Sequence, residues 1–330
     1  MVEFGIEFVP RNLYEKTIFY AVQAEKIGFD YLWIADHFSN RNVYISLAII
    51  SVHTKRIKLG PGITSPYLVH PIVTAQAVAT LNEIAPCRVV CGIGAGDKTN
   101  LQKVGLERTK PLATIRESVH IIREITSGKN LEMQGEIFRV SGAKLNFKVA
   151  NPIPIFIGAQ GTRMLALAAE IGDGILINAS DPKDVVEAMK SIGKGMKKAR
   201  KKRDLSVGVY ASLSVASDYE RAFEAVVPVV AYIVAGSPEA ILERHGIPVE
   251  LAGKIRDSIV HARWKEAFSY VNDSMVEVFS ICGAPETCVK KMDRLVKAGV
   301  NQLVVGSPIG PDMRKSMNMI AEQIFPHFKK

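Results

Sequence analysis

The sequence predicts a (β/α)8 barrel, an α/β fold in which eight parallel strands alternate with helices. The first observation is the alternation itself, because short apolar segments are followed again and again by amphipathic ones. The second is that several apolar segments stop at small residues, as in 57–64, 91–97, 157–161 and 304–308. The third is the length of 330 residues, which is ordinary for one such barrel.

Each expected strand is a short apolar run that stops at glycine, proline or a polar residue. The expected strands are residues 4–9, 31–35, 57–64, 88–93, 155–157, 174–178, 206–211 and 302–305. Between them, apolar residues recur at helical spacing, and Gly28, Gly128 and Gly172 follow the last turns of three helices. The expected helices are residues 14–27, 43–53, 71–84, 112–127, 162–171, 182–199 and 285–298.

Two insertions interrupt this alternation. Residues 129–149, before the fifth strand, alternate between apolar and polar as a hairpin does. Residues 219–281, after the seventh strand, indicate several helices, broken near 236–238 and 246–248 by glycine and proline. We expect neither insertion to carry an independent core, and no low-complexity linker occurs, so we expect one domain over residues 1–330.

The charge balance indicates which kind of ligand the protein would bind. The net charge is +9, and much of the excess lies in residues 194–203. This run is typical of a solvated helix end, and it lacks the interleaved aromatic residues of a nucleic-acid surface. We therefore expect no nucleic-acid partner, whereas small anionic ligands would suit a basic protein.

Compartment and metal content follow from the apolar runs and the cysteines. No apolar stretch is long enough to span a bilayer, and the N-terminus lacks the features of a signal peptide. We expect a cytoplasmic protein without a membrane partner. Cys87, Cys91, Cys282 and Cys288 do not have the spacing of metal ligands, and we expect free thiols and no metal site.

In such barrels the working residues gather at the carboxyl ends of the strands. The candidates there are Glu7, Asp36, His37, Gly62, Ile63, Thr64, Gly94, Ala95, Asp97, Gly158, Ala159, Gln160, Gly161 and Asn178. Glu7 is an acid within an apolar strand, and if it points into the barrel, desolvation would suit it to proton transfer. A salt bridge with a buried base is the alternative for Glu7.

Other candidates have simpler alternatives. Asp97 is either a helix cap or a second carboxylate facing the same pocket. Asp36 and His37 are either a helix-start pair or ligand contacts. The glycines of 92–96 lack the spacing of a dinucleotide fingerprint, and we interpret them as room for a flat ring against the backbone. Gln160 precedes a helix whose free N–H groups would suit a phosphate.

Taken together, these segments resemble the methylenetetrahydromethanopterin reductases of methanogenic archaea, which are bacterial-luciferase-like barrels. The resemblance extends over nearly the whole chain. It includes Trp33-Ile34-Ala35-Asp36-His37, Leu59-Gly60-Pro61-Gly62-Ile63-Thr64, Gly94-Ala95-Gly96-Asp97-Lys98, Gly158-Ala159-Gln160-Gly161 and Val304-Val305-Gly306-Ser307-Pro308. Many matches in the same order are more specific than any one of them.

The resemblance implies an oxidoreductase of one-carbon metabolism and methanogenesis from CO2. It would reduce 5,10-methylenetetrahydromethanopterin to the 5-methyl form with hydride from reduced coenzyme F420, an 8-hydroxy-5-deazaflavin that acts as a dissociable cosubstrate. It would be archaeal and would form a homo-oligomer, a dimer or a tetramer, in which helices of 219–281 could lie between subunits.

The resemblance also implies roles for individual residues. Glu7 would be the proton donor, and Asp97 and Gln160 the other catalytic polar positions. Asp36 and His37 would bind the deazaflavin, and a cis peptide would join Gly62 to Ile63. The remaining cofactor contacts would be Thr64, Gly94, Ala95, Gly158, Ala159, Gly161 and Asn178. Lys98 and Arg163 are candidates for the acidic tails by position only.

Two enzymes of the same superfamily are the alternatives. A deazaflavin-dependent secondary alcohol or sugar-phosphate dehydrogenase would share Asp36, His37 and the third-strand bulge. An FMN-dependent monooxygenase would have to react with oxygen. Glu7 and residues 94–98 favour the pterin reductase. A basic nucleic-acid-binding barrel without catalysis is a third possibility from another class, and we expect it to fail a binding test.

Overall fold

The structure of the chain is a computed structural model that describes residues 2–200 and 205–329. The described residues form two compact units. The larger unit holds residues 3–178 and 187–208, and the smaller unit holds residues 179–186 and 209–329. The single domain expected over 1–330 stays a prediction.

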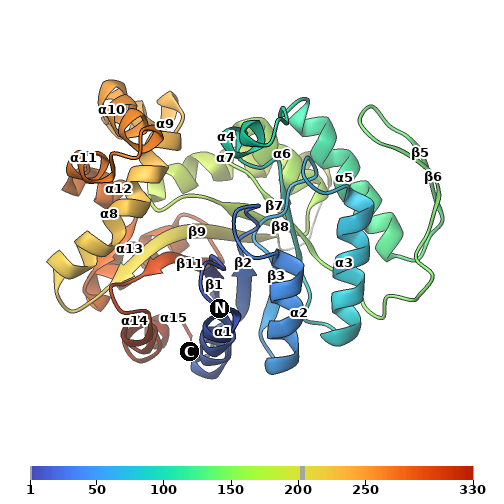
Figure 1. The fold of residues 1–330 in the computed structure, drawn as a ribbon, viewed down its shortest axis with the longest axis horizontal. Coiled ribbons are helices and arrows are strands. Elements are labelled where there is room, and N and C mark those ends of the chain that lie inside the picture. The colour runs from blue at the N-terminus through green and yellow to red at the C-terminus, as the bar shows by residue number, and fades with distance from the viewer. Residues whose placement is uncertain (1, 201–204, 330) are drawn as a thin grey trace. The chain divides into compact units, whose positions relative to one another are not determined.

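The larger unit contains six parallel strands, and their order in the sheet is the same as their order in the chain. They are β1 (Glu3–Phe8), β2 (Tyr31–Ile34), β3 (Lys58–Pro61), β4 (Cys91–Gly94), β7 (Ile155–Gly158) and β8 (Gly174–Ile177). Regular ladders join β1 to β2, β2 to β3, β4 to β7 and β7 to β8 (Figure 1). Two bridges, Leu59 with Val89 and Thr64 with Ile93, join β3 to β4. The carboxyl ends of these strands therefore lie along one edge.

Helices cover this sheet in chain order. They are α1 (Tyr14–Ile27), α2 (Val43–His53), α3 (Pro71–Ile84), α4 (Lys98–Lys103), α5 (Pro111–Thr126), α6 (Thr162–Ile171) and α7 (Pro182–Lys198). In the larger unit α1 packs on α2, α2 on α3, α3 on α5 and α5 on α6. Four helices, α1, α2, α3 and α6, have the bounds predicted from the sequence. Residues 201–203 of the basic run lie outside the described residues, and Lys197 and Lys198 close α7.

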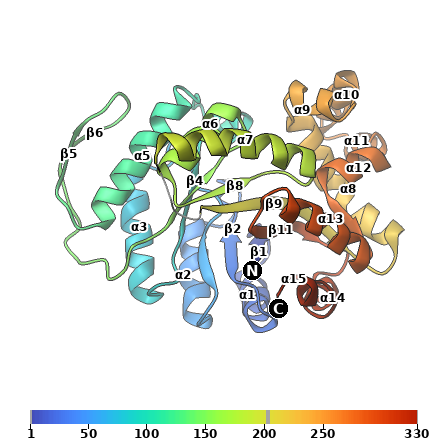
Figure 2. The ribbon, with the colours of Figure 1, turned by 180° about the vertical axis from the view of Figure 1, so that it is seen from behind.

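The hairpin expected over 129–149 is present. It consists of β5 (Leu131–Gln134) and β6 (Arg139–Ala143), which pair antiparallel beside α5 (Figure 2). Glu117 of α5 holds the turn of the hairpin, because its carboxylate accepts hydrogen bonds from the N–H groups of Glu136 at 2.7 Å and Phe138 at 2.9 Å. The insertion is thus tied to the helix that precedes it.

The smaller unit contains most of β9 (Ser206–Val215), with β10 (Ile281–Gly283) and β11 (Gln302–Ile309) as its neighbours. β10, which the sequence did not predict, pairs in parallel with β9. The helices of this unit are α8 (Tyr219–Gly236), α9 (Glu239–Arg244), α10 (Val249–Val260), α11 (Trp264–Ser269), α12 (Asp273–Phe279), α13 (Pro285–Lys297), α14 (Met313–Met319) and α15 (Phe325–Phe328), with a π-helix at Ile320–Ile324. β1, β2, β3, β4, β7, β8, β9 and β11 correspond to the eight predicted strands.

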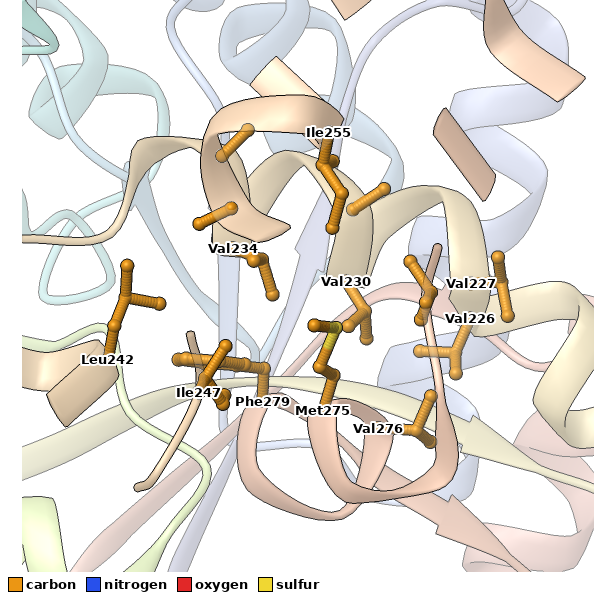
Figure 3. Packing of buried hydrophobic residues seen from close by; sticks show 14 residues of the cluster. Val226, Val227, Val230, Val234, Leu242, Ile247, Ile255, Met275, Val276 and Phe279 are labelled. Atoms are coloured by element: carbon orange, nitrogen blue, oxygen red, sulfur yellow. The ribbon is translucent and has the colours of Figure 1, made fainter. Parts of the chain in front are cut away.

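The insertion 219–281 has a core of its own, which differs from the prediction. Fourteen buried apolar side chains from α8 to α12 form one cluster, shown in Figure 3. Val226, Val230 and Val234 recur every four residues on α8 and meet Met275 and Phe279 of α12. These side chains are therefore used within the unit, and the suggestion that helices of 219–281 lie between subunits stays a prediction.

Strand bounds are the other difference from prediction. β3 stops at Pro61 rather than at residue 64, because a cis peptide follows between Gly62 and Ile63. β9 and β11 run four residues beyond their predicted ends. The short helix α4 has too few turns to show an apolar period in the sequence.

Candidate active site

A bulge at the end of β3, residues 62–64, is the centre of the candidate site. The Gly62–Ile63 peptide is cis, as the resemblance implied. The Gly62 N–H donates to the Ile34 carbonyl of β2 at 2.8 Å. On the other side, the Thr64 N–H donates to the Gly92 carbonyl at 3.0 Å, and the Gly94 N–H donates to the Thr64 carbonyl at 3.0 Å. Backbone hydrogen bonds therefore hold the bulge from both neighbouring strands.

The glycines around the bulge make room for Ile63. A Cβ atom at Gly94 would lie 2.1 Å from Cδ1 of Ile63, and one at Gly158 would lie 2.7 Å from the same atom. No larger residue fits either position unless Ile63 moves. This corrects the interpretation of the glycine run as room for a flat ring, because an isoleucine side chain occupies the space. A ring would instead meet the accessible part of the half-buried Ile63.

Asp36 follows β2 and is bonded directly to the bulge. Its Oδ2 atom accepts a hydrogen bond of 2.7 Å from the Thr64 hydroxyl. Burial raises the pKa of the half-buried Asp36 carboxyl, although the Thr64 hydrogen bond and the nearby His37 oppose the shift. The structure thus brings together Asp36 and Thr64, which the sequence had placed on separate strand ends.

His37 lies exposed at the rim, in a field of mixed charge. Partial desolvation lowers the pKa of its imidazole, and the positive charge of Arg11 acts in the same direction. The carboxylates of Asp36 and Asp97 oppose this lowering. Strand ends β1, β2 and β4 therefore each contribute a charge around His37.

Asp97 caps α4. Its Oδ1 atom accepts from the Asn100 N–H at 2.8 Å, which is the N-cap geometry that the sequence offered as one alternative. The side chain is exposed beside His37. Its cap role is thus observed, and its predicted catalytic role stays a prediction.

Glu7 faces the interior of the strand layer. It is half-buried between Ile6 and Phe8, and it lies opposite Trp33 in the β1–β2 ladder. Residues opposite one another on paired strands share a face. The Trp33 ring is fully buried and packs edge-on against Phe156 of β7, with 5.3 Å between ring centres. Glu7 therefore lies on the inner face, as a proton-transfer role requires.

The remaining candidates fall into a buried and an exposed group. Ala159 is buried, and its N–H donates to the Leu176 carbonyl of β8 at 3.0 Å. Ala95 is half-buried. Gln160, Gly161 and Asn178 are exposed at the ends of β7 and β8, where Gly161 is the N-cap residue of α6. Their predicted contacts with substrate or cofactor stay predictions.

Sequence reasoning missed several groups around the bulge. Arg11, in the loop after β1, lies close enough for its positive charge to lower the pKa of His37, and the Arg108 Nη1 atom donates to the Gly96 carbonyl at 3.0 Å. Tyr44, near the start of α2, has a buried hydroxyl beside Thr64. No sequence signal singles out a tyrosine on a helix, whereas arginines that follow strand ends are a signal for anion contacts.

A cavity of about 540 Å³ lies at the opposite ends of the strands. Its wall includes Tyr31, Lys58 and Asp173. These groups are already paired, since the Lys58 ammonium donates to the Tyr31 hydroxyl at 2.9 Å and Asp173 accepts from the Ile155 N–H at 3.0 Å. Asp36, His37 and Asp97 lie near one another at the carboxyl ends, and we place the candidate site there.

The part of the chain that the structure describes shows neither a metal-binding cluster nor a membrane-spanning helix. No group of three histidine, cysteine or acidic side chains there is arranged to hold a metal ion. Among the same residues, no helix has the length and apolarity to cross a bilayer. The expectation that the protein uses no metal stays a prediction.

Comparison with known proteins now identifies the class of protein. Residues 7–302 match the family model of the luciferase-like monooxygenases, and the chain belongs to this luciferase-like family. The solved coenzyme F420-dependent tetrahydromethanopterin reductase of Methanopyrus kandleri is 40% identical, with a TM-score of 0.96 over 99% of each chain. This agreement confirms the predicted (β/α)8 barrel of the luciferase-like type.

Within that family, the chain belongs to the 5,10-methylenetetrahydromethanopterin reductases. The reductase of Archaeoglobus fulgidus is 49% identical over 99% of this chain and 100% of the relative. The reductase of Methanolobus tindarius is 43% identical over 97% and 99%. The resemblance seen in the sequence is thereby confirmed over the full length.

Proposed function

We propose that the chain reduces 5,10-methylenetetrahydromethanopterin to 5-methyltetrahydromethanopterin with hydride from reduced coenzyme F420. The observation that carries this proposal is the identity of 49% over essentially the whole chain with a reductase of that name. The arrangement of Glu7, Asp36 and the cis bulge along neighbouring strand ends supports it.

The residues at the bulge fit a planar ring with polar edges. Ile63 offers an apolar surface, and Asp36 and His37 offer polar groups next to it. When bound there as a dissociable cosubstrate, coenzyme F420 supplies the hydride. Asp36 and His37 would hold the ring edge, and the backbone of Gly62, Ile63 and Thr64 would hold its face.

Glu7 is the proposed proton donor. Reduction of the methylene bridge opens a ring of the pterin, so the nitrogen that leaves the bridge must receive a proton. A carboxyl group on the inner face of β1 can hold a proton next to that nitrogen and release it there. Asp97 and Gln160, exposed on neighbouring rim loops, are proposed to orient the pterin.

Anaerobic spectrophotometry tests this function. Reduced coenzyme F420 is mixed with the protein, with and without methylenetetrahydromethanopterin, and oxidation of the deazaflavin is followed by absorbance. We expect oxidation only with the pterin present. Oxidation of reduced coenzyme F420 by acetone at a comparable rate, or reduction of oxidised coenzyme F420 by glucose 6-phosphate, would favour the sibling dehydrogenases instead.

We also propose that the protein acts in the archaeal cytoplasm as a homo-oligomer, in methanogenesis or related one-carbon metabolism. Four free cysteines support a reducing compartment. Helix α2 supports an oligomer, because it carries no acidic residue, lysine or arginine, and its outward residues Ile45 and Val52 are 65% and 55% exposed. An apolar helix surface of this kind is usually covered.

A further inference from the structure

The hydrogen bond between Thr64 and Asp36 joins two parts of the candidate cofactor site. Thr64 is fully buried, and two backbone hydrogen bonds to β4 fix its position. Its side chain points the other way, to β2, where the hydroxyl donates to Oδ2 of Asp36 at 2.7 Å. A hydroxyl so placed can stabilise the ionised carboxylate and set its orientation.

The second oxygen of Asp36 remains available for a ligand. Among the described residues, the only hydrogen bond to the Asp36 carboxylate comes from Thr64. An ionised carboxylate accepts hydrogen bonds and cannot donate them. Whatever group meets Oδ1 of Asp36 must therefore carry an N–H or O–H.

Tyr44 lies behind this pair. Its hydroxyl is buried and approaches the hydroxyls of Thr64 and Thr74, but it forms no hydrogen bond of normal geometry with a described residue. A buried hydroxyl without a partner is costly. A small adjustment would let Tyr44 donate to Oγ1 of Thr64, which would turn the Thr64 proton toward Asp36.

We propose that Thr64 is a positioning residue that keeps Asp36 ionised and oriented, so that Oδ1 accepts a hydrogen bond from an N–H or O–H on the edge of the bound deazaflavin. Tyr44 supports the direction of the Thr64 hydroxyl. The ligand half of this inference rests on the proposed function, whereas the effect of Thr64 on Asp36 does not.

The titration of Asp36 has identifiable neighbours. Asp36 faces the hydroxyls of Thr64 and Tyr44 and the ring of His37, and His37 in turn faces Arg11 and Asp97. Removing the Thr64 hydroxyl takes away a hydrogen bond to the charged form only, so the pKa of Asp36 should rise. The neighbouring charges stay unchanged in that variant.

The experiment compares Thr64→Val, which removes the hydroxyl at nearly constant volume, with Thr64→Ser, which keeps it. Carboxyl carbon NMR of the ligand-free protein follows the Asp36 titration, with Asp36→Asn to assign the signal. We expect the pKa of Asp36 to rise by ~1 unit in Thr64→Val and to stay near wild type in Thr64→Ser. Tyr44→Phe should shift it in the same direction by less.

Binding of oxidised coenzyme F420, followed by fluorescence across pH, tests the ligand half. We expect about tenfold weaker binding near neutral pH in Thr64→Val and near-normal binding in Thr64→Ser. Thr54→Val is the matched control, since Thr54 is also fully buried and its hydroxyl donates to the Ile50 carbonyl at 2.9 Å. Thr54 lies before β3, whereas Thr64 lies after it. The Thr54→Val variant should lose stability without any change in the binding profile.

Each outcome decides a separate point. An unchanged Asp36 titration in Thr64→Val would overturn the positioning role. A raised pKa with unchanged cofactor affinity would overturn the contact between Asp36 and the ligand. If wild type bound no coenzyme F420 at all, the proposed function and the ligand half would both be wrong, while the NMR result would still decide the role of Thr64.

Discussion

Glu7 and Asp36 are both half-buried acids near the ends of neighbouring strands, but their surroundings suit them to different tasks. Glu7 lies on the inner face opposite Trp33, whereas Asp36 is bonded through Thr64 to the β3 bulge. Two carboxyl groups in the same active site can have different roles when their environments differ. We therefore propose that Glu7 delivers the proton and that Asp36 recognises the edge of the cofactor.

Replacing Glu7 by glutamine should remove the proton donor without changing the shape of the site. We expect kcat to fall by about 10²–10⁴-fold, with affinity for oxidised coenzyme F420 near wild type. Steady-state oxidation of the reduced deazaflavin and a fluorescence titration measure the two quantities. Glu3→Gln, on the same strand but paired with Lys58, is the control and should keep its activity. Turnover near wild type in Glu7→Gln would contradict the proton-donor role.

Asp97→Asn removes the negative charge of residue 97 but keeps its role as the helix N-cap, because asparagine caps helices as well as aspartate does. We expect α4 and the thermal stability to be unchanged. The KM for the pterin should rise modestly, by about 3–10-fold if one charged hydrogen bond to the substrate is weakened. An unchanged KM and kcat would leave Asp97 with its observed cap role and no part in catalysis.

At the scale of elements, two glutamates join helices to distant loops by the same means. The Glu25 carboxylate of α1 accepts from the N–H groups of Arg56 at 2.6 Å and Ile57 at 2.9 Å, just before β3. Glu117 of α5 holds the hairpin turn in the same way. Neither contact has a local sequence signal, since the partners are some 19 to 32 residues apart.

The Glu25 contact should appear in the pH dependence of stability. Burial alone would raise the pKa of Glu25, but the N–H groups of Arg56, Ile57 and Lys55 outweigh it, and the pKa lies below the ordinary value of 4.5. A lowered folded-state pKa means that this stabilisation is complete above pH 4.5 and is lost as the pH falls through the folded value.

Glu25→Gln should therefore lower the free energy of unfolding at pH 7 by about 1–2 kcal/mol. The difference in free energy of unfolding between Glu25→Gln and wild type should become smaller as the pH is lowered below 4.5. Urea denaturation at several pH values measures both effects. Glu83→Gln, an exposed residue on α3, serves as the control. A gap that stayed constant down to acid pH would mean that the charge of Glu25 is not what stabilises the contact.

At the scale of the whole molecule, the outer surface of α2 is the strongest sign of assembly. A surface helix normally carries charged residues on its outer side, yet α2 has only His53 near its end. The helices of 219–281, which the sequence suggested for this role, bury a cluster of apolar side chains within their own unit. We therefore propose that the subunit contact lies on α2.

Ile45→Lys should weaken the oligomer, because it puts a charge into an apolar contact. We expect light scattering after size exclusion to report a smaller species, or a dissociation constant raised by at least tenfold. Val260→Lys is the matched control, since Val260 of α10 is 73% exposed in the smaller unit. An oligomer unaffected by Ile45→Lys, with normal folding, would exclude α2 as the contact.

Much of the fold could be predicted from local pattern. Caps, glycines and apolar periods gave the bounds of α1, α2, α3 and α6 correctly, since these signals lie within the elements themselves. Strand ends were less accurate, because pairing with neighbours decides where a strand stops. The cis Gly62–Ile63 bond and the family came from the resemblance, and periodicity alone would not have given either.

The sequence by itself determined the order of the elements, the class of barrel and the rim positions that carry polar residues, because each of these depends on residues close together in the chain. Only the tertiary structure decided that Ile63 fills the space beside Gly94, that Thr64 donates to Asp36, and that 219–281 encloses its own core. These contacts join residues that are far apart in sequence. Their partners are chosen by how the strands and helices pack, which no local pattern records.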